Sequence, residues 1–282
     1  MPVLTALRSA LVALDGSAYS ESATALSIQW AKRSGARLLG LGVLDAPSID
    51  RPEPVPMGAG AYKRTRDEAR LVDAHRRVLG FLADFKSRSA AAGVTADVVE
   101  DIGDPAERIL REVQRCDLVV IGRQTHFRFE TQDQADTTLA GILRDSPRPI
   151  VIVPRELPEG RGIVVAYGGG REAARTLQTF QLLGLAGGEE IDVVSIHRDR
   201  AEAEGIVRLA GDFLSAHEAP QRLHPVASDA APAEVVLDEV RRRRPRLLVM
   251  GAQGHHGLRD LFATSVTRAV LGACPVPVFV GA

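Results

Sequence analysis

The chain of 282 residues contains the same sequence pattern twice, and this duplication restricts its fold more than any single motif. LVALDGS (residues 11–17) corresponds to VVAYGGG (residues 164–170), and LVVIGRQ corresponds to LLVMGAQ. Near the end of each copy, SPRPIVIVP corresponds to CPVPVFVGA. We therefore expect two related domains, over residues 1–156 and 160–282, joined by the polar, turn-rich segment RELPEGRG.

Each copy alternates short apolar runs with longer amphipathic segments. The runs are apolar on both faces, as in DLVVIG, which is typical of buried parallel strands. In the first copy we expect strands near 10–15, 37–44, 96–101, 117–122 and 149–153, and helices near 18–34, 64–92, 105–115 and 136–145. Such alternation favours right-handed crossovers and a parallel sheet. The predicted fold is α/β, with two doubly wound, five-stranded, Rossmann-like domains in tandem.

Composition excludes several classes of function. The 35 basic and 36 acidic residues give a net charge of −1, which argues against a nucleic-acid binder. The one basic cluster, RRRRPR (residues 241–246), is interpreted as a solvated helix end. No apolar run approaches the roughly 18 residues that a membrane span needs. The two cysteines are far apart, which suits a reducing compartment, so we expect a cytoplasmic protein without membrane contact.

The chain resembles tandem universal stress proteins over nearly its whole length. The resemblance rests on DGS after the first strand and on GAQGHHGLRDLFATSV (residues 251–266) before the last apolar run. It implies an adenine-nucleotide alpha-hydrolase-like fold. In ATP-binding members of that family, a Gly-x-x-Gly loop and a later small–Ser/Thr pair wrap the ribose and phosphates. An aspartate ending the first strand helps to hold the nucleotide, and the end of the second strand lies against the adenine.

The resemblance implies a nucleotide site mainly in the second copy, where Thr264 replaces one glycine of the pattern. Turns of free N–H groups beside a helix N-terminus favour anions. Tyr167 is expected in the place of Asp15, and Ile196 and His197 are expected to flank the base. The full set of expected binding residues is Gly251, Gly254, Gly257, Thr264, Ser265, Val266, Tyr167, Gly168, Ile196 and His197.

The first copy matches the pattern less well. It keeps Asp15, Val43 and Gly122 as weaker candidates, but Thr125 stands at the second glycine. Asp136-Thr137 stands in the place of the small–Ser/Thr pair, with one residue too many before it. Since an acid repels phosphates, we expect no conventional ATP binding there. Two questions stay open. Asp15 either helps to hold a nucleotide or only starts a turn or caps the first helix. The long loop at 45–62 is either a lid or a proline-stiffened excursion.

The sequence predicts a stress-response protein that binds ATP or another adenine nucleotide, with Mg²⁺ as a companion ion, as a regulatory ligand. The last strands of the two copies are expected to pair across a pseudo-two-fold axis, and a homodimer of chains is a further option. No Ser-His-Asp set, P-loop lysine or metal-ligand spacing is present, so we expect no enzyme. The alternatives are an interaction module with vestigial sites and a weak ATPase.

Overall fold

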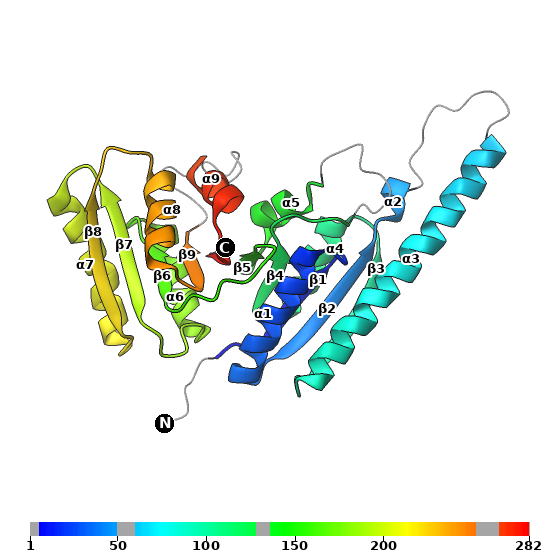
Figure 1. Cartoon of the computed structure of the whole chain (residues 1–282), viewed down its shortest axis with the longest axis horizontal. Coiled ribbons are helices and arrows are strands. Elements are labelled where there is room, and N and C mark those ends of the chain that lie inside the picture. Colours follow the sequence, from blue (N-terminus) through cyan, green and yellow to red (C-terminus); the bar gives the residue numbers. More distant parts are fainter. Residues whose placement is uncertain (1–5, 50–59, 128–135, 252–264, 282) are drawn as a thin grey trace.

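A computed structural model describes residues 6–49, 60–127, 136–251 and 265–281, and its strands form one ten-stranded sheet (Figure 1). The strand order is β3-β2-β1-β4-β5-β10-β9-β6-β7-β8. The first five strands are β1 (Ser9–Leu14), β2 (Arg37–Leu44), β3 (Ala96–Ile102), β4 (Leu118–Gly122) and β5 (Ile150–Val153). The others are β6 (Ile163–Ala166), β7 (Ile191–His197), β8 (Gln221–Ala227), β9 (Leu247–Met250) and β10 (Val278–Val280). Pairing within each half is parallel, which confirms the predicted fold class.

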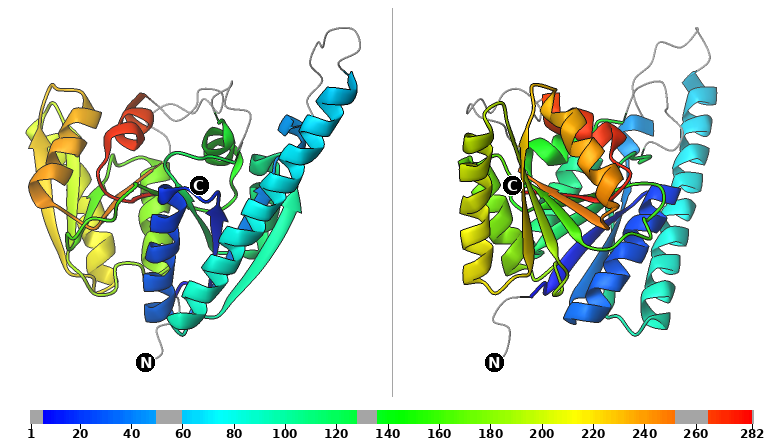
Figure 2. Two further views of the ribbon diagram at one scale, coloured as in Figure 1. Left: turned by 45° about the vertical axis from the view of Figure 1, so that its right-hand side comes forward. Right: turned by 60° about the vertical axis from the view of Figure 1, so that its left-hand side comes forward.

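Helices cover both faces of the sheet, as a doubly wound fold requires (Figure 2). One face carries α1 (Ala18–Ser34), α3 (Gly60–Ala91), α6 (Arg171–Leu182) and α7 (Arg200–Ala216). The other carries α4 (Pro105–Glu112), α5 (Thr138–Asp145), α8 (Pro232–Arg243) and α9 (Ser265–Ala273). The short α2 (Ala46–Ile49) and a 3₁₀ turn, η1 (Val113–Arg115), complete the described helices. None of these helices is long and apolar enough to cross a membrane.

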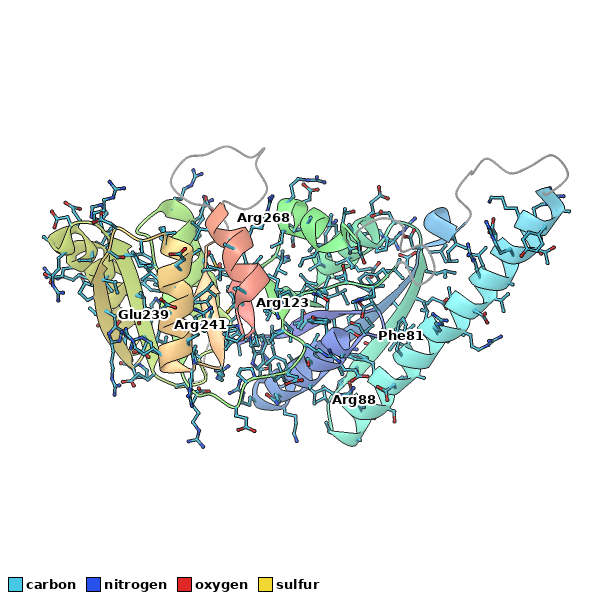
Figure 3. The ribbon with its side chains drawn as sticks, turned by 45° about the horizontal axis from the view of Figure 1, so that its top comes forward. Phe81, Arg88, Arg123, Glu239, Arg241 and Arg268 are labelled. Carbon is cyan, nitrogen blue, oxygen red and sulfur yellow. The ribbon has the colours of Figure 1, made fainter. Side chains whose placement is uncertain are left out.

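The two halves meet where β5 pairs antiparallel with β10, which confirms the predicted pairing of the last strands. Val151 lies opposite Phe279, and Phe279 is fully buried with its ring edge-on to Phe180 at a centroid distance of 5.5 Å. Arg123, which Figure 3 labels, adds a polar contact between the halves. Its Nη1 donates to the carbonyl of Cys274 at 2.6 Å. The apolar core therefore continues across the boundary between the halves.

Local signals in the sequence account for the helix ends. The carboxylate of Asp104 accepts the N–H of Glu107 at 3.1 Å, and Pro105 is the first helical residue of α4, as the sequence indicates. The arginine run at the end of α8 is largely neutralised within its own half. Arg241 pairs with Asp238, while Arg242 and Arg243 both pair with Glu239 (Figure 3). This run is therefore mostly part of local ion pairs.

Strand register fixes which residues of the two halves correspond. Leu11 pairs with Leu39 and Val119, whereas Val164 pairs with Asp192 and Leu248. Since Val119 and Leu248 hold the same place before their strand-ending Gly122 and Gly251, Leu11 corresponds to Val164.

Counting along the strands from this pair, Asp15 corresponds to Gly168, and Tyr167 corresponds to Leu14. The backbone agrees, because Gly16 and Gly169 have φ values of 73° and 74° just before their helices. The expectation that Tyr167 takes the place of Asp15 is therefore wrong by one residue.

The joint between the halves generates a prediction about stability. Phe279→Ala removes a fully buried ring at the centre of the joined sheet, so we expect a loss of about 3–5 kcal/mol in the free energy of unfolding. Tyr62→Ala is the matched control, because Tyr62 is 74% exposed. Chemical denaturation measures both variants. A loss below about 1 kcal/mol for Phe279→Ala would show that the joint contributes little.

Candidate functional site

In the first half, the carboxylate of Asp15 binds the protein's own backbone. Asp15 is only 5% exposed. Its Oδ1 accepts the N–H of Ser17 at 2.9 Å, and its Oδ2 accepts the N–H of His126 at 2.7 Å. Asp15 therefore ties the segment that follows β4 to the start of α1. The turn-forming alternative for Asp15 fits these bonds, while Ser17 supplies the cap by accepting the N–H of Ser20.

A second carboxylate, that of Asp136, also accepts backbone N–H groups between β4 and α5. Asp136 accepts the N–H of Phe127 at 3.2 Å and the N–H of Thr138, at the start of α5, at 2.9 Å. The ring of Phe127 is 1% exposed within the core. Asp15 and Asp136 thus accept backbone N–H groups of the described residues that follow β4. Whether the first half binds a nucleotide stays a prediction.

The strand-ending glycines have a packing reason for being glycine. A methyl group at Gly122 would lie 2.6 Å from Cβ of Tyr19, in the first turn of α1. A methyl group at Gly251 would lie 3.2 Å from the backbone nitrogen of Ala173, in the first turn of α6. Close helix–strand contact therefore explains both glycines without a ligand. Val43, the third candidate of the first half, is fully buried in the core.

In the second half, no side chain of the described residues fills the place that corresponds to Asp15. A side chain at Gly168 would meet no atom within 4 Å among the described residues. Gly170 is the N-cap of α6 and has no side chain to accept an N–H, whereas its counterpart Ser17 accepts one. The start of α6 therefore has neither the carboxylate nor the hydroxyl that serves α1. Free N–H groups at a helix start, with positive dipole charge, favour an anion.

Three other expected binding residues of the second half, Tyr167, Ile196 and His197, do not lie together in one site. Tyr167 is 7% exposed in the core on the α6 and α7 side, and burial raises the pKa of its phenol. Ile196 is half-buried on the opposite face, against the α8 and α9 side. His197 is exposed, and its Nδ1 accepts the N–H of Asp199 at 3.0 Å. Tyr167 and Ile196 therefore do not lie on the same face of the sheet.

Part of the predicted site lies outside the described residues. Gly254, Gly257 and Thr264 belong to this group, as does the stretch 50–59 of the long loop. Ser265 is the first residue of α9, and Val266 is half-buried against the core. Across the residues that are described, no cluster of three or more His, Cys, Asp or Glu side chains could hold a metal ion.

Sequence reasoning missed two features of the site. It did not predict that Asp15 would accept the N–H of His126, or that Asp136 would accept the N–H of Phe127. It also assigned the counterpart of Asp15 to Tyr167 rather than to Gly168. The signal for the second feature was available, because direct alignment of LVALDGS with VVAYGGG already places the acid opposite Gly168.

Comparison with known proteins agrees with this architecture. The model of the universal stress protein family matches residues 7–154 and 161–280. The two matched segments correspond to the two halves of the sheet, and the chain belongs to the universal stress protein family.

Three similar proteins cover nearly the whole chain. Universal stress protein Slr1230 of Synechocystis is 21% identical, covering 96% of this chain and 99% of its own. A universal stress protein structure from Archaeoglobus fulgidus has a TM-score of 0.71 at 19% identity, covering 97% of both chains. A structure of a functionally unknown protein from Pseudomonas aeruginosa has a TM-score of 0.60 at 16% identity, covering 98% of this chain and 92% of its own.

The internal bonds of Asp15 can be tested by substitution. Asp15→Ala leaves the N–H groups of Ser17 and His126 without their acceptor, so we expect a loss of about 1–3 kcal/mol in the free energy of unfolding. Asp97→Ala is the control, because Asp97 forms an exposed pair with Arg37 on the same half. Equal stability of Asp15→Ala and the wild type, measured by denaturant unfolding, would contradict a structural role for Asp15.

Proposed function

We propose that this chain binds ATP or another adenine nucleotide, with Mg²⁺ as a companion ion, in its second half as a regulatory ligand. The first half serves as the structural partner that completes the sheet. We further propose that the nucleotide is held rather than turned over, and that the protein works in the cytoplasm. A dimer of whole chains stays a prediction.

The observation that carries this proposal is the contrast between the two strand ends. In the first half, Asp15 and Asp136 take backbone donors of the segment that follows β4. In the second half, Gly168 and Gly170 leave the start of α6 without an acid or a side-chain cap. A ligand in an open α/β sheet sits beyond the carboxyl ends of the strands, which is where Gly168 lies.

The family gives further support at a coarser level. One universal stress protein has been solved in complex with cAMP, and it covers 54% of this chain at 20% identity and a TM-score of 0.35. That ligand belongs to that protein. The choice of an adenine nucleotide here rests on the family resemblance, on the glycines of the segment after β9 and on the open start of α6.

Gly254→Val tests the location of the site. A β-branched side chain at this glycine blocks the approach of the backbone to a phosphate, so we expect Mg-ATP binding to be lost while the thermal unfolding midpoint is kept. Thr125→Val is the matched control, because Thr125 holds the corresponding position in the first half. Isothermal titration should find one site per chain in the wild type and in Thr125→Val.

Two results of this titration would contradict the proposal. Undiminished affinity in Gly254→Val would exclude this loop as the nucleotide site. Absence of any binding by the nucleotide-stripped wild type would favour the interaction-module alternative instead.

Gly168→Asp places an acid at this strand end, as Asp15 does in the first half. Among the described residues, no atom lies within 4 Å of the added Cβ. Because the new carboxylate would take backbone donors as Asp15 does and would repel phosphate, we expect affinity for ATP to fall about tenfold. Gly205→Asp adds the same charge at an equally open position on α7 and serves as control. Equal or stronger binding by Gly168→Asp would contradict the proposal that the missing acid makes room for the nucleotide in the second half.

A further inference from the structure

A groove of about 420 Å³ lies between the C-terminal half of α1 and the linker that joins the halves. Its apolar lining comes from Leu26 of α1, Leu157 and Pro158 of the linker, and Pro277 before β10. These residues come from both halves, so the groove exists only where the duplicated chain is joined. It is lined by C-terminal residues of α1, whereas the proposed nucleotide site involves the N-terminal end of α6.

The walls of the groove are held in place by contacts that need no ligand. The hydroxyl of Ser22 donates to the carbonyl of Arg155 at 2.6 Å, which fixes the start of the linker to α1. Leu157 packs against the main core. Gly160 lies against the carbonyl of Arg244 so closely that no side chain fits between them. The groove is therefore formed before any ligand arrives, as small-molecule sites usually are.

The polar side of the groove is cationic. Lys32, Arg33 and Arg246 line it, and Gln29 adds an amide. Arg246 and Arg33 share one carboxylate, that of Glu189, at 2.6 Å and 3.6 Å. Within the described part of the chain, no carboxylate pairs with Lys32. The groove therefore carries more positive than negative charge beside its apolar lining.

This charge is not a general property of the fold, because the equivalent positions of the opposite halves carry no cation. By strand register and helix starts, Lys32 and Arg33 correspond to Leu185 and Ala186 of the second half. Arg246 corresponds to Asp117 of the first half.

The two halves use carboxylates at different sequence positions to accept the corresponding backbone N–H group. Asp117 accepts the N–H of Ser9 at 2.9 Å. The corresponding N–H, that of Gly162, donates to Glu189 at 2.8 Å. In the second half, Glu189 accepts the N–H that corresponds to the one that Asp117 accepts in the first half. Position 246, which corresponds to Asp117, can therefore be an arginine that lines the groove.

We propose that this groove binds a small organic carboxylate with an apolar or aromatic body. The carboxylate accepts from the ammonium group of Lys32, the amide of Gln29 lies beside it, and Arg33 and Arg246 add positive potential. The body covers the apolar lining of Leu26, Leu157 and Pro277. A doubly charged phosphate needs several free donors, whereas Lys32 is the one lining cation without a carboxylate partner among the described residues. A monoanion therefore suits the groove better.

The test uses ¹⁹F NMR of the full chain with 4-fluorobenzoate and its neutral analogue 4-fluorobenzamide. We expect saturable binding of 4-fluorobenzoate and weaker binding of the amide. Lys32→Gln should weaken 4-fluorobenzoate binding about threefold to fivefold, the effect of one exposed charge. Lys86→Gln makes the same change at an exposed site on α3 and should leave binding as in the wild type.

Several results would overturn the proposal. They are the absence of saturable binding by the wild type, equal affinity of Lys32→Gln and the wild type, an equal loss in Lys86→Gln, and affinity for the amide that matches that for the acid. Displacement of 4-fluorobenzoate by Mg-ATP would also overturn it, because the probe would then occupy the nucleotide site. Both Lys variants change an exposed side chain, so an unchanged melting temperature confirms that each is folded.

Discussion

The antiparallel pairing of β5 with β10 is the interaction on which the rest of the molecule depends. Each half alone would end its sheet in an edge strand with unpaired backbone groups, which favours aggregation. Pairing the two edges satisfies these groups and lets Phe279 pack against Phe180 in a core shared by both halves. Because the halves complete each other in this way, neither half needs a nucleotide to hold the sheet together.

The ends of β1 and β6 differ in how their neighbouring backbone N–H groups find an acceptor. In the first half, the carboxylates of Asp15 and Asp136 accept the N–H groups of His126 and Phe127. In the second half, Gly168 has no carboxylate, and no atom of the described residues lies within 4 Å of where its Cβ would be. Backbone N–H groups need an acceptor, and the two halves meet that need from different sources. The proposed nucleotide is the source for the second half.

Much of the fold follows from local patterns in the sequence. The bounds of α1 and β2 agree with those predicted, and the Asp104 cap does so as well, because periodicity and capping act over a few residues. The bond from His126 to Asp15 joins residues 111 positions apart through an irregular segment, and no periodic pattern encodes it. Placing Tyr167 opposite Asp15 is an error of one residue beside a run of glycines. The register of the strands shows that Gly168 corresponds to Asp15.

The linker has a consequence for how such a protein responds to its own abundance. Two separate subunits joined through their last strands would come apart on dilution, and their assembly would follow the amount of protein in the cell. Here Ser22 and Gly160 hold a short tether against both halves, so the partner is always present at the same effective concentration. The joined sheet therefore persists at any expression level.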